Sequence, residues 1–191
     1  MPVSKSPATL VLHGGGFRHD PTTAATTVPI YQSTSFDFPD TATAIKIINF
    51  EQIAFTYSRV TNPTVDAFET RLAALEGGAA ALGVASGQAA TALAVLNLVE
   101  AGDNIVSSPD LYGGAVHLFK ERLKQFGIEA RFVDPADPEN FRRATDARTR
   151  LYFGESLPNP KLSVFPIAEV AAIGRPLGIP LIIDNTAAPL A

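Results

Sequence analysis

The sequence predicts an α/β fold in which helices cover both faces of a mostly parallel sheet. Short apolar segments without polar alternation, such as residues 104–107 and 179–183, are typical of strands buried on both faces. Segments with helical spacing of apolar residues, such as 87–99, lie between them, as in chains built from βαβ units. A length of 191 residues with 46% apolar residues suits one domain with a sizeable core.

The first sixty residues differ from the rest of the chain. They are rich in Thr, Pro and Phe and show no steady period, which indicates an arm that packs on another surface. Asp40 is a candidate N-cap for a short helix that runs through Ile48. We therefore predict an N-terminal arm over residues 1–60 and a larger domain over residues 61–191.

The larger domain opens with a well-marked helix. Asn62 is a favourable N-cap, Pro63 suits the first helical position, and Gly77 suits the helix end. Beyond it, we expect strands at residues 80–85, 104–107, 129–133, 150–154 and 179–183. We expect further helices at residues 87–99, 114–125, 139–144 and 167–177.

Composition excludes several classes of function. A net charge of −4 and a pI near 5.3 argue against nucleic acid as a partner, because binding to phosphate backbones needs clustered Lys and Arg. The absence of cysteine excludes disulfides, thiolate catalysis and Cys-ligated zinc. The first residues lack the apolar segment of a signal peptide, and no apolar run reaches the ~18 residues of a membrane span. We expect a cytoplasmic protein without a membrane partner.

Two strand ends carry residues suited to a charged ligand. Ser86-Gly87-Gln88 lies between a strand and a helix, where a Ser N-cap and the free N–H groups of the first turn favour a bound phosphate. The alternative is an ordinary helix cap. Asp184 follows the apolar residues 181–183, and a carboxylate at the end of a buried strand needs a cation or several donors. The alternative there is an Asp that caps the following turn.

Two further strand ends carry polar or aromatic residues. Glu155 is followed by a loop in which prolines at positions 158 and 160 present Asn159 rigidly, although a proline-stiffened turn is the alternative. Tyr112 precedes two glycines at a helix start, where its ring could cover a flat ligand or pack in the core.

Six motifs occur in an order that resembles a known family. They are Val28-Pro29-Ile30-Tyr31-Gln32-Ser33-Thr34-Ser35, Tyr57-Ser58-Arg59 with Asn62-Pro63-Thr64, Ser86-Gly87-Gln88-Ala89-Ala90, Tyr112-Gly113-Gly114, Glu155-Ser156-Leu157-Pro158-Asn159-Pro160 and Asp184-Asn185-Thr186. Together they resemble the Cys/Met-metabolism family of enzymes that depend on pyridoxal 5′-phosphate (PLP). The resemblance runs from about Thr9 to the last residue. It implies the large domain of PLP fold type I, the aspartate aminotransferase-like fold.

The resemblance also implies roles for individual residues. Gly87 and Gln88, with Ser86, would bind the PLP phosphate, and Tyr112 would stack on the ring. Asp184 would pair with the protonated ring nitrogen, with Thr186 beside it. Tyr112 and Asp184 are thus the candidate catalytic residues. Asn159 would lie near the phenolic oxygen of the cofactor, and Glu155 would support that loop.

The family's quaternary structure bears on two more cofactor-binding candidates. The equivalents of Tyr57 and Arg59 reach across a subunit interface to the neighbouring phosphate, which implies a homo-oligomer, expected as a dimer of dimers. An Arg fork suits a phosphate dianion.

The family's covalent cofactor lysine lies beyond the Asp184 motif, and its smaller C-terminal domain carries the arginine for the substrate carboxylate. The five lysines here all precede Asp184: Lys5, Lys46, Lys120, Lys124 and Lys161. We therefore expect this chain alone to hold PLP at most noncovalently, and to be a fragment, a truncated gene product or one part of a split enzyme with a separate C-terminal portion.

Gln88, where many lyases of the family have methionine, resembles the O-acetylhomoserine sulfhydrylase branch. This implies γ-replacement on O-acetyl-L-homoserine by sulfide or a thiol, in trans-sulfuration and methionine biosynthesis. The alternatives are cystathionine γ-synthase or γ-lyase activity, methionine γ-lyase activity, and an inactive cofactor-binding half that acts as an oligomer partner. A lipase-like reading of His13-Gly14-Gly15-Gly16 fails because no Gly-x-Ser-x-Gly elbow is present.

Overall fold

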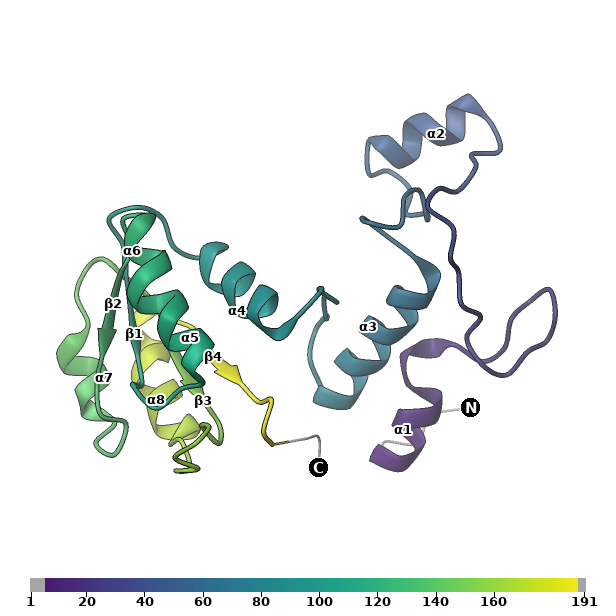
Figure 1. Cartoon of the computed structure of the whole chain (residues 1–191). Coiled ribbons are helices and arrows are strands. Elements are labelled where there is room, and N and C mark those ends of the chain that lie inside the picture. Colours follow the sequence, from purple (N-terminus) through teal and green to yellow (C-terminus); the bar gives the residue numbers. More distant parts are fainter. Residues whose placement is uncertain (1–5, 189–191) are drawn as a thin grey trace. The chain divides into compact units, whose positions relative to one another are not determined.

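The computed structural model describes residues 6–188, which form two compact units. The first unit comprises residues 6–83 and the second residues 84–188. Figure 1 labels the helices and strands of both. No helix among residues 6–188 is long and apolar enough to cross a membrane.

A four-stranded parallel sheet forms the centre of the second unit. Its strands are β1 (Asn104–Ser107), β2 (Glu129–Phe132), β3 (Thr149–Glu155) and β4 (Leu181–Asp184), in the spatial order β2-β1-β3-β4. Every neighbouring pair is parallel. The chain therefore moves outward in one direction from β1 to β2 and then returns to the other side of β1. This reversal creates a switch point at the carboxyl ends of β1 and β3, where open α/β sheets bind ligands.

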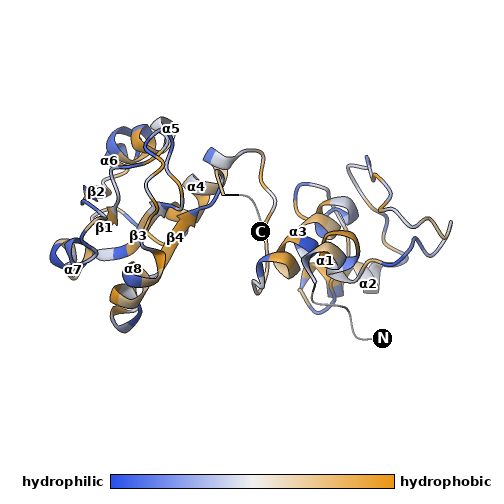
Figure 2. Cartoon of the chain, turned by 90° about the horizontal axis from the view of Figure 1, so that it is seen from below, coloured by the Kyte–Doolittle hydropathy of each residue, from blue (hydrophilic) through white to orange (hydrophobic). Residues whose placement is uncertain are grey.

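Helices cover both faces of this sheet. One face is covered by α4 (Gly87–Leu96), α5 (Gly113–His117), a π-helical turn (Leu118–Arg122) and α6 (Leu123–Gln125). The opposite face is covered by α7 (Glu139–Ala144) and α8 (Ile167–Gly174). Side chains alternate between the faces, so Ile105 joins the first core and Val106 the second. Figure 2 shows the apolar colouring of β3 and β4 between the helices. The predicted α/β class, with its parallel sheet, is confirmed.

Most of the predicted elements of the second unit are present. The helix predicted over 114–125 is interrupted by the π-helical turn, and the last predicted helix ends in a 3-10 turn, Arg175–Leu177. The strand predicted at residues 80–85 was wrong, because these residues pair with no strand in the described part of the chain. Leu82 is 77% exposed, so the apolar run there belongs to no core of this structure.

The first unit is built on α3 (Pro63–Glu76), with α1 (Pro7–His13), a 3-10 turn (Gly14–Gly16) and α2 (Thr41–Ile48). The predicted caps of two helices are confirmed. Asp40 accepts a hydrogen bond from the backbone N–H of Thr43. Asn62 caps α3 through the N–H of Thr64, and Gly77 ends α3 in the left-handed conformation.

The start of α3 also fastens the arm. The hydroxyl of Thr64 donates to the carbonyl of Pro29 and accepts from the N–H of Tyr31, at 2.9 Å each. The side-chain amide of Asn62 donates to the carbonyl of Tyr31 at 3.0 Å. Two motifs that lie thirty residues apart in the sequence are thus one hydrogen-bonded structure.

Candidate functional site

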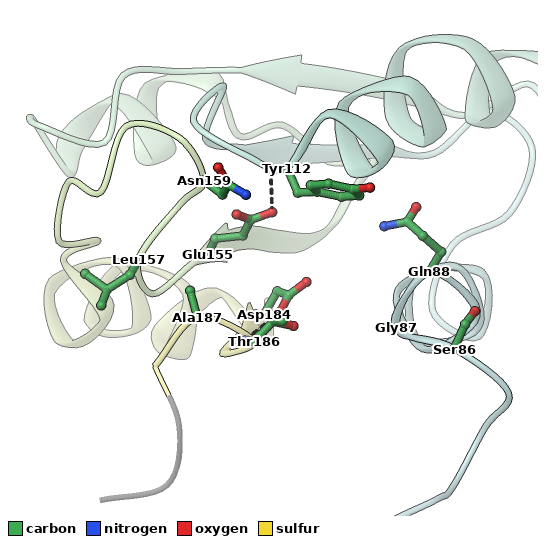
Figure 3. A pocket seen from close by; sticks show the side chains of 10 residues that line it. All are labelled: Ser86, Gly87, Gln88, Tyr112, Glu155, Leu157, Asn159, Asp184, Thr186 and Ala187. Atoms are coloured by element: carbon green, nitrogen blue, oxygen red, sulfur yellow. Dashed lines mark hydrogen bonds between the residues drawn. The ribbon is translucent and has the colours of Figure 1, made fainter.

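The start of α4 and the loops beyond the carboxyl ends of β1, β3 and β4 surround a cavity of about 400 Å³ in the second unit (Figure 3). Its lining residues are Ser86, Gly87, Gln88, Tyr112, Glu155, Leu157, Asn159, Asp184, Thr186 and Ala187. Eight of them are among the ten site residues that the sequence suggested. The other two, Tyr57 and Arg59, belong to the first unit.

The N-terminus of α4 forms one wall of the cavity. The hydroxyl of Ser86 accepts from the N–H of Ala89 at 3.1 Å, and the carbonyl of Ser86 accepts from the N–H of Ala90 at 2.9 Å. The N–H groups of Gly87 and Gln88 have no partner among the described residues, as expected for a first helical turn. A side chain at Gly87 would meet no atom within 4 Å, so the space above it is open. This geometry suits an anion such as phosphate.

Asp184, the last residue of β4, lies at another wall. Its Oδ1 atom accepts hydrogen bonds from both the backbone N–H and the hydroxyl of Thr186, which fix the orientation of the carboxylate. Its Oδ2 atom has no hydrogen-bond partner within residues 6–188. The carboxylate of Asp184 is therefore held in a fixed orientation, and its Oδ2 atom can still accept a hydrogen bond from a ligand.

Glu155, the last residue of β3, brings a second carboxylate to the cavity. The residue is 6% exposed, and its Oε1 atom accepts from the backbone N–H of Tyr112 at 2.7 Å. Burial raises the pKa of the Glu155 carboxyl, and the nearby charge of Asp184 raises it further. The backbone N–H groups of Tyr112 and Asn159 lower this pKa in part. The lining residues include two carboxylates and no Lys or Arg, which favours a positively charged ligand.

The side chain of Tyr112 extends over the cavity toward Gln88 (Figure 3). Gly114 makes this placement possible, because a Cβ atom there would come within 2.7 Å of the Tyr112 ring and 3.2 Å of the Gln88 side chain. An ion pair between Lys161 and Asp110, 2.7 Å long, joins the loop before Tyr112 to the loop after Asn159. The half-exposed ring of Tyr112 therefore lies close to Gly114 and to the side chain of Gln88.

Some features of the site could not be identified from sequence. Leu157, inside the Glu155–Pro160 motif, and Ala187, directly after Thr186, line the cavity as apolar residues for which the sequence indicated no role of their own. The pairing of Asp110 with Lys161 joins residues 51 positions apart and has no local signal.

Tyr57 and Arg59 are presented by an extended pairing in the first unit. Tyr57 forms an antiparallel bridge with Ser35, and the N–H of Ser58 donates to the carbonyl of Thr34 at 2.9 Å. The guanidinium carbon of Arg59 lies 5.7 Å from the centre of the Tyr57 ring. The two predicted residues therefore form one local group.

The cavity fits PLP in size and in chemistry. Ligand pockets measure roughly 300–1,000 Å³. The free N–H groups of α4 suit a phosphate, the Asp184 carboxylate suits a protonated ring nitrogen, and the Tyr112 ring suits a flat heterocycle. Fold and cavity together define an α/β cofactor-binding domain whose site lies at the sheet's switch point.

Comparison with known proteins gives the family. The model of the Cys/Met metabolism PLP-dependent enzymes matches residues 8–190. The chain therefore belongs to this PLP-dependent family. The family expected from the six motifs is confirmed.

Two curated relatives are O-acetyl-L-homoserine sulfhydrylases. That of Leptospira meyeri is 48% identical over 97% of this chain, and that of Thermus thermophilus is 48% identical over 93%. The matched part is 42% of each relative, so the chain spans about two fifths of their length.

Two solved structures share the fold. A putative O-acetylhomoserine (thiol)-lyase from Campylobacter jejuni, which carries N′-pyridoxyl-lysine-5′-monophosphate, is 40% identical with a TM-score of 0.91. It matches 95% of this chain and 44% of its own. A cystathionine γ-lyase from Lactobacillus plantarum, complexed with L-serine, is 36% identical with a TM-score of 0.86. It matches 96% of this chain and 45% of its own. The expected fold type I of PLP enzymes is confirmed.

Proposed function

We propose that this chain supplies the cofactor-binding part of a PLP-dependent transferase that converts O-acetyl-L-homoserine and sulfide into homocysteine and acetate. A thiol in place of sulfide would give the corresponding thioether, such as methionine. One observation carries the proposal: the free N–H groups at the start of α4 and the carboxylate of Asp184 line the same cavity. The sulfhydrylases among the relatives support the choice of substrate.

Each lining residue then has a definite task. Gly87 and Gln88 donate their backbone N–H groups to the phosphate, and Ser86 keeps the helix start in place. Asp184, held by Thr186, would accept a hydrogen bond from the protonated ring nitrogen, and its negative charge would keep that nitrogen protonated and the ring cationic. When bound, PLP supplies an electron-withdrawing ring that stabilises negative charge on the carbons of an amino-acid substrate.

Two side chains act at the periphery of the ring. Tyr112 covers one face and limits access of water to it, and Asn159 offers its amide at the ring edge near the phenolic oxygen. No lining residue, all of which belong to the described part of the chain, is a lysine. We propose that the covalent cofactor lysine and the arginine for the substrate carboxylate come from a C-terminal portion of the enzyme.

We also propose a homo-oligomer, a dimer of dimers in the cytoplasm. Tyr57 and Arg59 would reach the phosphate in a neighbouring subunit. In the first unit, Phe50 and Ile53 are more than 90% exposed, and an interface would remove such side chains from water. In the whole subunit, residues 1–60 would act as the arm and residues 61–191 as part of the large domain.

The test is turnover by the enzyme that contains this chain. With PLP, O-acetyl-L-homoserine and sulfide, we expect homocysteine and acetate in equal amounts. Formation of products only from cystathionine would favour the γ-lyase activity that the Lactobacillus plantarum structure suggests. PLP binding without turnover of either substrate would favour an inactive oligomer partner.

A further inference from the structure

Two contacts join the loop after β1 to the loop after β3. The outer contact is the ion pair of Asp110 with Lys161, whose side chain is 62% exposed. The inner contact is the hydrogen bond from the Tyr112 backbone N–H to Glu155, at 2.7 Å. The inner contact lies beside the cavity and the outer contact does not line it.

A carboxylate as acceptor in the inner contact carries a cost in free energy, because its charge is buried. A neutral acceptor would satisfy the N–H of Tyr112 without placing a second negative charge next to Asp184. Burial and Asp184 both disfavour the ionised form of Glu155. A carboxylate differs from a neutral side-chain amide because both of its oxygens accept hydrogen bonds. The Oε1 atom of Glu155 accepts a hydrogen bond from the N–H of Tyr112 at 2.7 Å, and the backbone N–H of Asn159, which lines the same cavity, also lowers the pKa of the Glu155 carboxyl.

Tyr112 and Asn159 are the residues that meet the face and the edge of the cofactor in the proposed function. Their two loops come from different strands, so local structure alone does not fix their spacing. We propose that Glu155 is a positioning residue that fixes the distance between the backbones of Tyr112 and Asn159. The side chain of Tyr112 can then contact the face of the cofactor ring while that of Asn159 contacts its edge. This role rests on the proposed function and deepens it.

The test measures noncovalent binding of pyridoxamine 5′-phosphate, which has no aldehyde and therefore does not react with lysines. Its fluorescence gives the Kd for the wild-type chain and for Glu155→Ala. We expect the substitution to weaken binding about 10-fold to 100-fold, as for loss of hydrogen bonds to a charged group. The induced circular dichroism of the bound ligand should also change, because the Tyr112 ring shifts.

A double-variant comparison separates positioning from other effects. Tyr112→Ala and Asn159→Ala remove the side chains and keep the backbone N–H groups, so Glu155 can still bind them. In that background we expect Glu155→Ala to change the Kd less than about 2-fold. An equal loss in both backgrounds would mean a direct charge effect or a general loss of structure, and would overturn the proposal. Should Glu155→Ala not fold, Glu155→Gln is used in the same comparison.

Controls distinguish this proposal from the proposed function. Lys161→Gln breaks only the outer contact and should leave the Kd within about 2-fold, as for exposed ion pairs. Pyridoxamine without phosphate should bind much more weakly than its phosphate ester. If the wild-type chain binds neither compound, both proposals fail. If it binds the phosphate ester and Glu155→Ala binds equally well, only the positioning role fails.

Discussion

The carboxylate of Glu155, at the end of β3, accepts a hydrogen bond of 2.7 Å from the backbone N–H of Tyr112, at the start of α5. This contact connects two strand ends that face the same cavity. Burial raises the pKa of the Glu155 carboxyl, the hydrogen bond from Tyr112 lowers it in part, and the charge of Asp184 raises it further.

Stability should therefore depend on pH through Glu155. Its pKa lies above the ordinary value of 4.5 in the folded chain, so ionisation costs more in the folded than in the unfolded state. The contribution of Glu155 is complete below 4.5 and is lost as the pH rises through the raised pKa. Urea titrations from pH 4 to pH 8 should show a smaller loss of stability in Glu155→Gln than in wild type. An identical pH dependence in both proteins would contradict this assignment.

Asp184→Asn should weaken the binding of pyridoxamine 5′-phosphate. The amide cannot form a charge-assisted hydrogen bond with a protonated ring nitrogen, and such bonds contribute about 1.5–3 kcal/mol. We expect a Kd roughly 10-fold to 100-fold higher by fluorescence titration. Glu169→Gln, an exposed change on α8, is the matched control and should leave the Kd unchanged. Equal affinity of Asp184→Asn and wild type would show that Asp184 does not bind the ring nitrogen.

Asn62→Ala should destabilise the first unit. Asn62 is buried, caps α3, and donates to Tyr31 and Ser58, so its loss leaves several groups without partners. We expect a loss of about 1–3 kcal/mol in the free energy of unfolding. The control is Asn49→Ala, an exposed residue at the end of α2. Equal effects of the two substitutions by thermal or urea unfolding would show that the Asn62 contacts contribute no specific stability.

Gly174→Ala should destabilise the second unit. A Cβ atom at this position would lie 2.4 Å from the carbonyl oxygen of Ile179, a backbone atom that cannot turn aside. Overpacking of this kind costs about 1–3 kcal/mol. Gly78→Ala, where the nearest atom is 3.7 Å away, provides the comparison. A Gly174→Ala protein as stable as wild type would mean that β4 can move away from α8.

The sequence predicted the parts of the fold that depend on local chemistry. Asp40, Asn62 and Gly77 mark helix ends in the structure because capping needs only neighbouring backbone groups. Residues 80–85 have the composition of a strand, but a strand also needs a pairing partner, which composition does not reveal. The π-helical turn at Leu118–Arg122 likewise has no marker in the sequence.

The site was predicted from motifs at strand ends, because parallel strands bring their carboxyl ends to one edge. That logic gathers Tyr112, Glu155 and Asp184 in one cavity, whereas Ser86 joins them at the start of α4 with no strand before it in the described chain. It does not give the atoms that join the loops. The hydrogen bond from the Tyr112 N–H to Glu155 depends on the register of β1 and β3, which only the folded structure fixes.

A crystal structure of the chain with pyridoxamine 5′-phosphate tests the central claim most directly. We expect phosphate oxygens within about 3 Å of the N–H groups of Gly87 and Gln88, and the ring nitrogen within the same distance of Asp184. A ligand bound with its phosphate away from α4, or with its ring nitrogen turned away from Asp184, would contradict the account.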